Sequence, residues 1–208
     1  FTITTKVIPD GRVSKHIVRN IKVGDYLPVG LPQGDFYLPD ASPIQPLFIT
    51  AGSGITPAMS MVRSLIAQKR LPDTVHIHYA PNVFDVIFGK ELRKMDAEQQ
   101  HYHLHEVHTH EFGEDKQTKG YFNLEQLERF CPDWKERDCY ACGPVPLMAA
   151  LEKTFEEAGL SRRLHIERFL AEFAPIPDEA IGGKVRFAAS GIEVEADSET
   201  NLLRVAED

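Results

Sequence analysis

The chain has 208 residues, of which 42% are hydrophobic and 26% are charged, and its formal net charge is -8. This composition is typical of a soluble globular protein, and the negative charge argues against nucleic acid or an acidic membrane surface as a partner. No apolar run approaches the roughly 20 residues that cross a bilayer. The three cysteines are an odd number, which fits a reducing cytoplasm better than a disulfide framework.

The first 42 residues predict a small all-β region in which glycine and proline separate short strands. The expected elements are strands over 1–8, 24–29 and 34–38 and a helix over 13–20. Ala41-Ser42-Pro43 is expected to link this region to the next part of the chain.

The stretch Gly11-Arg12-Val13-Ser14 lies where the β region turns into its helix. A serine at a helix start commonly caps the helix through its hydroxyl. The alternative is a phosphate site, because the free N–H groups of a helix start accept an anion. The sequence leaves both interpretations open.

From residue 46 onward, strands and helices alternate along the chain. The expected strands cover 46–50, 74–80, 101–108, 138–142 and 164–168, and the expected helices cover 57–69, 89–98, 123–130 and 144–158. This alternation predicts a doubly wound parallel sheet with helices on both faces. Residues 43–169 are therefore expected to form one α/β domain.

The junction after the first of these strands carries the most informative ligand signal. An apolar run, Pro46–Ile49, leads into Thr50-Ala51-Gly52-Ser53-Gly54-Ile55-Thr56-Pro57. Glycines let the backbone approach a ligand closely, the helix start offers N–H groups to a pyrophosphate, and Pro57 suits the first helical turn. The spacing Gly-x-Gly-x-x-Pro departs from the Gly-x-Gly-x-x-Gly fingerprint of dinucleotide sites. The loop therefore does not by itself establish nucleotide binding.

Cys139 and Cys142 form a Cys-x-x-Cys pair at the end of an expected strand. A redox dithiol or a zinc site needs its cysteines at a helix start or in a knuckle, with partners nearby. The sequence has one other cysteine, Cys131, so we favour a different interpretation. Cys142 is expected to end a strand at a ligand crevice, beside the Gly143-Pro144 turn.

Histidines are concentrated in the strand expected over 101–108. His101, His103 and His105 would point to one face of a strand, as a metal site requires. No cysteine or carboxylate motif of the sequence converges on them, so we favour an exposed sheet edge and predict no metal site. Gly-x-Ser-x-Gly, His-Glu-x-x-His and P-loop patterns do not occur in the sequence, which disfavours hydrolases and nucleoside triphosphatases.

The last part of the chain predicts a linker and a hairpin. Residues 170–183 are rich in proline and glycine, as linkers are. Beyond them, 184–188 and 192–196 predict two paired strands, and a helix is expected to begin near Thr200. About 25 residues cannot form an independent core. Residues 184–208 are therefore expected to start a further domain.

Taken in order, these segments resemble the ferredoxin–NADP reductase superfamily over essentially the whole chain. The motifs that carry the resemblance are Gly11-Arg12-Val13-Ser14, the segments from Gly24-Asp25 to Gly34-Asp35-Phe36, the loop 50–57, Val86-Ile87-Phe88 with Glu91-Leu92, Cys142-Gly143-Pro144, and His165-Ile166-Glu167-Arg168-Phe169. The tail from Lys184 is similar to the opening hairpin of a plant-type [2Fe–2S] ferredoxin. The resemblance implies the C-terminal part of an FAD-binding β-barrel over 1–42, an NAD(P)-binding domain over 43–169, and the start of a β-grasp ferredoxin domain over 184–208.

The resemblance also implies a role for each motif. The FAD pyrophosphate would lie on Gly11, Arg12, Val13 and Ser14, and the nicotinamide nucleotide on Gly52, Ser53, Gly54, Ile55, Thr56 and Pro57. Cys142, Gly143 and Pro144 would approach the nicotinamide, and Glu167 and Phe169 would lie near the flavin ring, which makes Cys142, Glu167 and Phe169 the candidate catalytic residues. The implied reaction is hydride transfer from NAD(P)H to FAD, followed by single-electron transfer through a [2Fe–2S] centre.

Two features of this superfamily lie outside the sequence. They are the Arg-x-Tyr-Ser/Thr flavin motif and the cluster cysteines of plant-type ferredoxins, spaced C-x₄-C-x₂-C with a distant fourth. A barrel without all its strands has unpaired edges. We therefore expect the middle of a longer protein, in which this chain supplies part of the FAD site and the cluster belongs to the untruncated protein only.

The implied electron acceptor is an oxygenase or a fatty-acid desaturase, and a membrane-bound acceptor is compatible with a chain that has no spanning segment. The nucleotide choice turns on Tyr79–Asn82, where neither an acidic residue nor an arginine stands. Lys90, Arg93 and Lys94 on the next helix favour NADPH. Two alternatives remain: a flavohaemoglobin-type reductase module, against which the hairpin after residue 183 argues, and a non-catalytic nucleotide-binding or partner-docking module.

Overall fold

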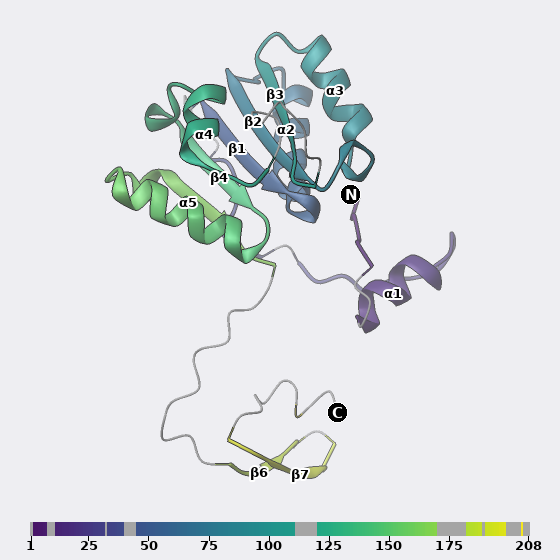
Figure 1. The fold of residues 1–208 in the computed structure, drawn as a ribbon. Coiled ribbons are helices and arrows are strands. Elements are labelled where there is room, and N and C mark those ends of the chain that lie inside the picture. Colours follow the sequence, from purple (N-terminus) through teal and green to yellow (C-terminus); the bar gives the residue numbers. More distant parts are fainter. Residues whose placement is uncertain are drawn as a thin grey trace. The chain divides into compact units, whose positions relative to one another are not determined.

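A computed structural model describes residues 2–7, 11–31, 33–39, 45–110, 120–169, 182–188, 190–198 and 205. The chain divides into two compact units, Phe1–Phe169 and Leu170–Asp208 (Figure 1). The first unit contains a five-stranded sheet, and the second contains a two-stranded one.

The sheet of the first unit is parallel throughout. Its strands are β1 (Pro46–Ala51), β2 (Thr74–Ala80), β3 (Tyr102–His108), β4 (Asp138–Cys142) and β5 (Leu164–Glu167), in the spatial order β3-β2-β1-β4-β5. β1 and β2 are buried almost along their whole length, as expected for central strands covered on both faces. The five strands predicted from the sequence are confirmed to within one residue at each end.

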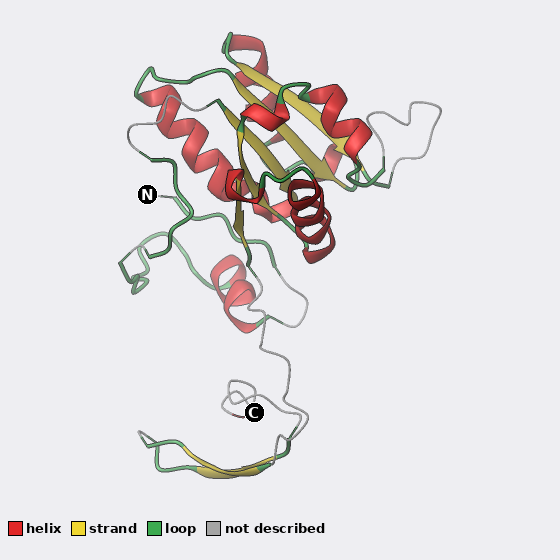
Figure 2. Cartoon of the chain, turned by 90° about the vertical axis from the view of Figure 1, so that its left-hand side faces the viewer, coloured by secondary structure: helices red, strands yellow, loops and turns green. Residues whose placement is uncertain are grey.

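Helices cover both faces of this sheet (Figure 2). They are α2 (Ile55–Ala67), α3 (Gly89–Glu98), α4 (Leu124–Phe130) and α5 (Val145–Glu157). Each had been predicted at nearly these bounds. Among the described residues, no helix combines the length and the apolar character that crossing a bilayer requires.

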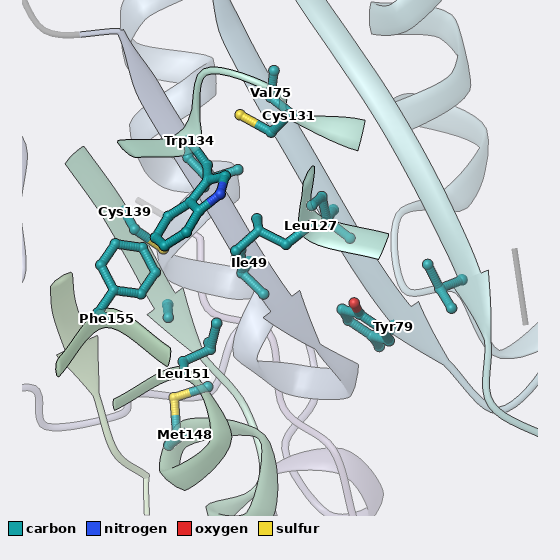
Figure 3. Packing of buried hydrophobic residues seen from close by; sticks show 14 residues of the cluster. Ile49, Val75, Tyr79, Leu127, Cys131, Trp134, Cys139, Met148, Leu151 and Phe155 are labelled. Carbon is teal, nitrogen blue, oxygen red and sulfur yellow. The ribbon is translucent and has the colours of Figure 1, made fainter. Parts of the chain in front are cut away.

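The face covered by α4 and α5 holds a dense apolar core (Figure 3). Trp134 lies in a short 3-10 helix before β4, and its ring meets the ring of Phe155 from α5 at a centroid distance of 5.0 Å. Leu127 of α4 packs beside Ile49 of β1 in the same cluster. Since all four side chains are 2% exposed or less, this face supplies apolar burial rather than a site.

The face covered by α2 and α3 is apolar in part and polar in part. Phe48 of β1 and Tyr140 of β4 pack there against Met59 of α2 and Leu92 of α3. The side chain of Phe36 also joins this cluster, with its ring 5.8 Å from that of Tyr140. The segment before the sheet is therefore tied to the α2 face.

The described residues before β1 contain one helix, α1 (Arg12–Arg19), close to the predicted bounds. The strands predicted over 24–29 and 34–38 are wrong for this structure, because both segments are loops, and residues 2–7 likewise form no strand. A strand needs a neighbouring strand to accept its backbone hydrogen bonds. The described part of the chain offers these segments none, since every ladder lies within the two sheets.

The second unit is described by an antiparallel hairpin. Its strands are β6 (Gly183–Arg186) and β7 (Glu193–Ala196), with Val185 opposite Val194. The predicted hairpin is confirmed. An isolated two-stranded hairpin is marginally stable in water. The predicted linker over 170–183 and the helix near Thr200 fall almost wholly outside the described residues.

Candidate functional site

The predicted ligand loop, residues 50–57, lies at the carboxyl edge of the sheet, where β1 leads into α2. Gly52–Gly54 form a single 3-10 turn, and α2 begins at Ile55, which places Pro57 in its first turn as predicted. Gly52 has a φ of +52°, and nothing lies within 4 Å of the position of a Cβ there. The backbone at Gly52 is therefore left-handed and open, which suits a close approach by a ligand.

Gly54 has a packing role beside the one predicted for it. A Cβ on Gly54 would overlap the backbone of Cys142 and Gly143, where β4 turns into α5. Gly54 is itself buried. Its missing side chain therefore makes room for the neighbouring turn, so that the ligand loop lies directly against the end of β4.

Three candidate positions stand side by side across the sheet. Cys142 is the register partner of Thr50 in β1 on one side and of Glu167 in β5 on the other. The Cys142 side chain is 1% exposed, and burial together with the Glu167 carboxylate raises its pKa to about 12. The thiol is therefore neutral at physiological pH and is neither a nucleophile nor a base.

The buried thiol predicts slow chemical modification. At pH 8 iodoacetamide is expected to alkylate Cys142 roughly 10³-fold more slowly than an exposed cysteine, because the thiolate fraction falls with the rise in pKa. Peptide mapping by mass spectrometry after native and denatured labelling measures this. Denatured protein is the control, and alkylation of native Cys142 at the rate of a free thiol would contradict the prediction.

Cys139 and Cys142 do not act as a pair. Residues three apart on a strand point to opposite faces, and Cys139 lies in the apolar core under α5 while Cys142 faces the α2 side. Both thiols are free. Cys142 does end β4, as predicted.

One cavity bordered by predicted site residues has a volume of about 610 Å³. It brings together the ligand loop and the end of β5, because Thr56, Pro57, Glu167 and Phe169 all line it. The rest of its wall comes from the segment before the sheet, namely Thr2, Ile3, Thr4, Gln33, Gly34, Phe36 and Tyr37. Phe169 is 55% exposed, so its ring is available to a ligand in this cavity.

The predicted phosphate motif Gly11–Ser14 forms the start of α1. The helix is capped by Gly11, with no side-chain hydrogen bond at the cap, and Ser14 stands three residues further on. The interpretation of Ser14 as the capping residue is therefore wrong. Gly11 has no side chain with which to cap the first turn of α1.

The histidine run occupies the sheet edge, as favoured from the sequence. His101 precedes β3, while His103 Nε2 lies 3.1 Å from Asp73 Oδ1 and the His105 ring stacks on Phe130 at 4.5 Å. These side chains thus have separate partners. Within the described ranges, no three His, Cys, Asp or Glu side chains come together as metal ligands.

Sequence reasoning missed two buried histidines next to the ligand loop. His76 Nε2 and His78 Nδ1 each lie 2.8 Å from the Thr50 hydroxyl, and His76 Nδ1 lies 2.6 Å from the Tyr102 hydroxyl. Both rings are fully buried. Desolvation lowers both pKa values, that of His78 to about 4, so both rings are neutral. The available signal was their position in a central parallel strand, which is buried on both faces.

The cations expected near the nucleotide are partly engaged. Arg93 donates to Glu106 at 2.8 Å, and Lys94 lies 3.9 Å from Glu98. Asn82, at the end of β2, accepts from the Phe84 N–H at 2.9 Å and so caps the turn that follows. Arg93, Lys94 and the turn after β2 are therefore held by interactions with neighbouring residues.

Comparison with known proteins gives a consistent result. Residues 48–153 match the family described as oxidoreductase NAD-binding domain. The chain is 41% identical to an NADPH oxidoreductase from Mycobacterium tuberculosis, over 99% of this chain and 52% of that protein. It is 36% identical to a glycine betaine monooxygenase reductase subunit from Pseudomonas aeruginosa, over 93% of this chain and 52% of that protein.

A solved structure shares the fold. It is the flavohem-like FAD/NAD binding domain of nitric oxide dioxygenase from Vibrio cholerae, with a TM-score of 0.64 and 27% identity, over 76% of this chain and 65% of that one. The chain spans about half the length of the curated relatives it matches.

Proposed function

Because the chain belongs to the oxidoreductase NAD-binding domain family, and with it to the ferredoxin–NADP reductase superfamily, we propose that it is part of an NAD(P)H-dependent flavoprotein reductase. In this proposal the bound nucleotide would supply hydride to FAD, and a [2Fe–2S] centre would carry single electrons on to an oxygenase or a fatty-acid desaturase. The observation that carries this proposal is the cavity shared by the ligand loop and the end of β5, beside Cys142.

The nicotinamide nucleotide is proposed to lie across the start of α2. The open, left-handed backbone at Gly52 lets a pyrophosphate approach the start of α2 closely, so Gly52–Pro57 would hold it. Cys142 and the Gly143-Pro144 turn would border the nicotinamide ring, because Gly54 holds that turn against the loop.

The flavin ring is proposed to occupy the 610 Å³ cavity. Phe169 would cover one face of the ring, and the carboxylate of Glu167, in the same wall, would lie beside it. Gly11, Arg12, Val13 and Ser14, at the start of α1, would hold the FAD pyrophosphate. Residues 1–42 would then belong to the C-terminal part of the FAD-binding domain, where the described segments are α1 and loops.

Nicotinamide and flavin supply the redox chemistry when bound, and the chain's own residues would align them and exclude water. A neutral Cys142 thiol fits a packing contact with the nicotinamide rather than acid–base work. Cys142, Glu167 and Phe169 are therefore proposed as residues that touch the reacting rings.

The C-terminal unit and the relatives support the proposed electron acceptor. The two curated relatives match 99% and 93% of the chain and so extend past β5, and one of them is named as a monooxygenase reductase subunit. This favours an iron–sulfur route, with residues 184–208 as the start of a ferredoxin domain. The likeness to a flavohem-like domain supports the alternative of a flavohaemoglobin-type module. That likeness covers 76% of the chain, which is less than the share that either curated relative covers.

NADPH is the proposed nucleotide. Arg93 pairs with Glu106, and Lys94 pairs with Glu98. Of the three candidate cations on α3, we therefore propose that Lys90, in the first turn of the helix, binds the 2′-phosphate. We also propose a cytoplasmic location, from the cysteine content.

The visible spectrum of the untruncated protein tests the proposal. Anaerobic NADPH is expected to bleach flavin and iron–sulfur bands, and NADH is expected to do so more slowly. A protein without a chromophore, or one that neither nucleotide bleaches, would instead support a non-catalytic nucleotide-binding or docking module. Flavin bleaching without iron–sulfur bands would favour the flavohaemoglobin-type arrangement.

A further inference from the structure

A row of polar side chains crosses the whole sheet at the level of the ligand loop. The register pairs Glu167 with Cys142, Cys142 with Thr50, Thr50 with His78, and His78 with Glu106, so the row has one member on every strand. Register partners in a parallel sheet project to the same face. This is the face that α2 and α3 cover, opposite the apolar core under α5.

Thr50 lies on the central strand of this row, and its side chain contacts two other side chains. Its hydroxyl lies 2.8 Å from a ring nitrogen of His76 and 2.8 Å from one of His78. Thr50 is 1% exposed, and both rings are fully buried, so no solvent competes for these contacts.

The chemistry of the three groups fixes how they bond. Both rings are neutral, and each neutral imidazole has one N–H donor and one bare nitrogen. A hydroxyl has a single proton, so Thr50 donates to one ring and accepts from the other, whichever direction the chain of bonds takes. Both functions of the hydroxyl are therefore in use, and no apolar side chain of the same shape can replace it.

The network fixes the end of β1 relative to its neighbours. His76 continues it to the Tyr102 hydroxyl on β3 at 2.6 Å, so three strands are joined through side chains as well as through backbone. Thr50 is two residues before Gly52, and its register partner on the other side is Cys142. The same hydroxyl thus steadies both the ligand loop and the residue proposed to meet the nicotinamide.

We propose that Thr50, held between His76 and His78, is a positioning residue that sets the ligand loop and Cys142 for hydride transfer. The inference rests on the proposed function. Thr50 itself touches neither the nucleotide nor the flavin; it acts through Cys142 and Gly52. A small displacement of reacting groups is enough to slow a reaction strongly, by up to about 10²-fold for 1 Å.

The test uses the full-length protein with its cofactors bound, and two substitutions of the same kind. Thr50→Val removes the hydroxyl and keeps the shape. Thr74→Val is the matched control, because Thr74 is fully buried, donates to the Pro72 carbonyl at 2.8 Å and lies at the opposite end of the strands. Thr50→Ser keeps the hydroxyl and serves as the rescue.

Stopped-flow reduction of the flavin by NADPH separates rate from affinity. Thr50→Val is expected to lower the limiting rate roughly tenfold, because the reacting rings are misaligned, while the apparent Kd for NADPH changes less than about twofold. Thr50→Ser and Thr74→Val are expected to reduce flavin at the wild-type rate. An unchanged limiting rate in Thr50→Val, or an equal fall in Thr74→Val, would overturn the inference.

Two further outcomes are distinguished in the same experiment. If wild-type flavin is not reduced, the proposed function fails rather than the role of Thr50. If the melting curve shows that Thr50→Val does not fold, the variant Tyr102→Phe tests the inference instead. It removes only the Tyr102 hydroxyl, at the far end of the network. Tyr102→Phe is expected to slow reduction about threefold at unchanged Kd, and a wild-type rate there would contradict the inference.

Discussion

Replacement of Gly54 by alanine is expected to destabilise this protein strongly, because Gly54 has the least room for a Cβ among the described glycines. The new Cβ would overlap the backbone of Cys142 and Gly143, which no side-chain rotation relieves. Separating α2 from the β4–α5 turn is expected to lower the free energy of unfolding by about 3 kcal/mol or more. Thermal melting of the full-length protein would then show a fall of roughly 10 °C.

Gly52→Ala is the matched control in the same loop. Its Cβ meets open space, and its strain comes from the left-handed φ of +52°, which costs about 1–2 kcal/mol in a non-glycine residue. Gly52→Ala is therefore expected to fold with a smaller loss of stability than Gly54→Ala. Equal melting temperatures for the two variants would show that the predicted overlap is relieved elsewhere.

A marked loss of stability below pH 6.5 is the second large effect that we expect. His76 and His78 are neutral in the folded protein, because burial lowers their pKa values, that of His78 to about 4. The unfolded chain takes up protons on both rings near pH 6.5, so it binds more protons than the folded chain as the pH falls. The free energy of unfolding therefore falls by about 1.4 kcal/mol per pH unit for each ring, down to about pH 4 for His78.

The charges that face these rings do not offset this effect. His76 meets Thr50 and the Tyr102 hydroxyl, which are neutral, and His78 lies near His108, whose charge would oppose its own. Glu106 is the register partner of His78, and it accepts from Arg93. Protonation is therefore not compensated within the network.

Melting temperatures of the full-length protein between pH 7.5 and 4.5 measure this dependence. His78→Gln is expected to remove about half of the slope. His101→Gln, at an exposed position before β3, is expected to leave the slope unchanged. A flat melting temperature over this range would show that the buried rings take up protons in the folded state.

The α/β unit could be predicted well because burial on both faces leaves a strong sequence signal. β1 is a short apolar run, β2 is buried along its whole length, and the helix between them, α2, ends just before the polar Gln68. The segments 24–29 and 34–38 were predicted as strands on local signals of the same strength. They form loops because strand formation depends on a partner strand, which local sequence does not reveal.

The location of the candidate site could be predicted from the sequence, but the hydrogen-bond network beside it could not. Thr56, Pro57, Glu167 and Phe169 were singled out from the sequence, and one cavity brings them together. The Thr50 network was missed, because His76 and His78 interrupt an apolar run and only the register brings them to Thr50. Contacts between strands depend on pairing, which a single sequence does not specify.

The strand order β3-β2-β1-β4-β5 has a consequence for how this protein can change. From β1 the chain adds strands outward in one direction, and with β4 it returns to the centre and continues in the other. The connections that leave β1 and β4 therefore diverge to opposite faces, and the crevice between them is a product of topology. Substitutions in the turns after these two strands would alter which ligand fits the proposed site, while the position of the crevice stays fixed by the winding of the chain.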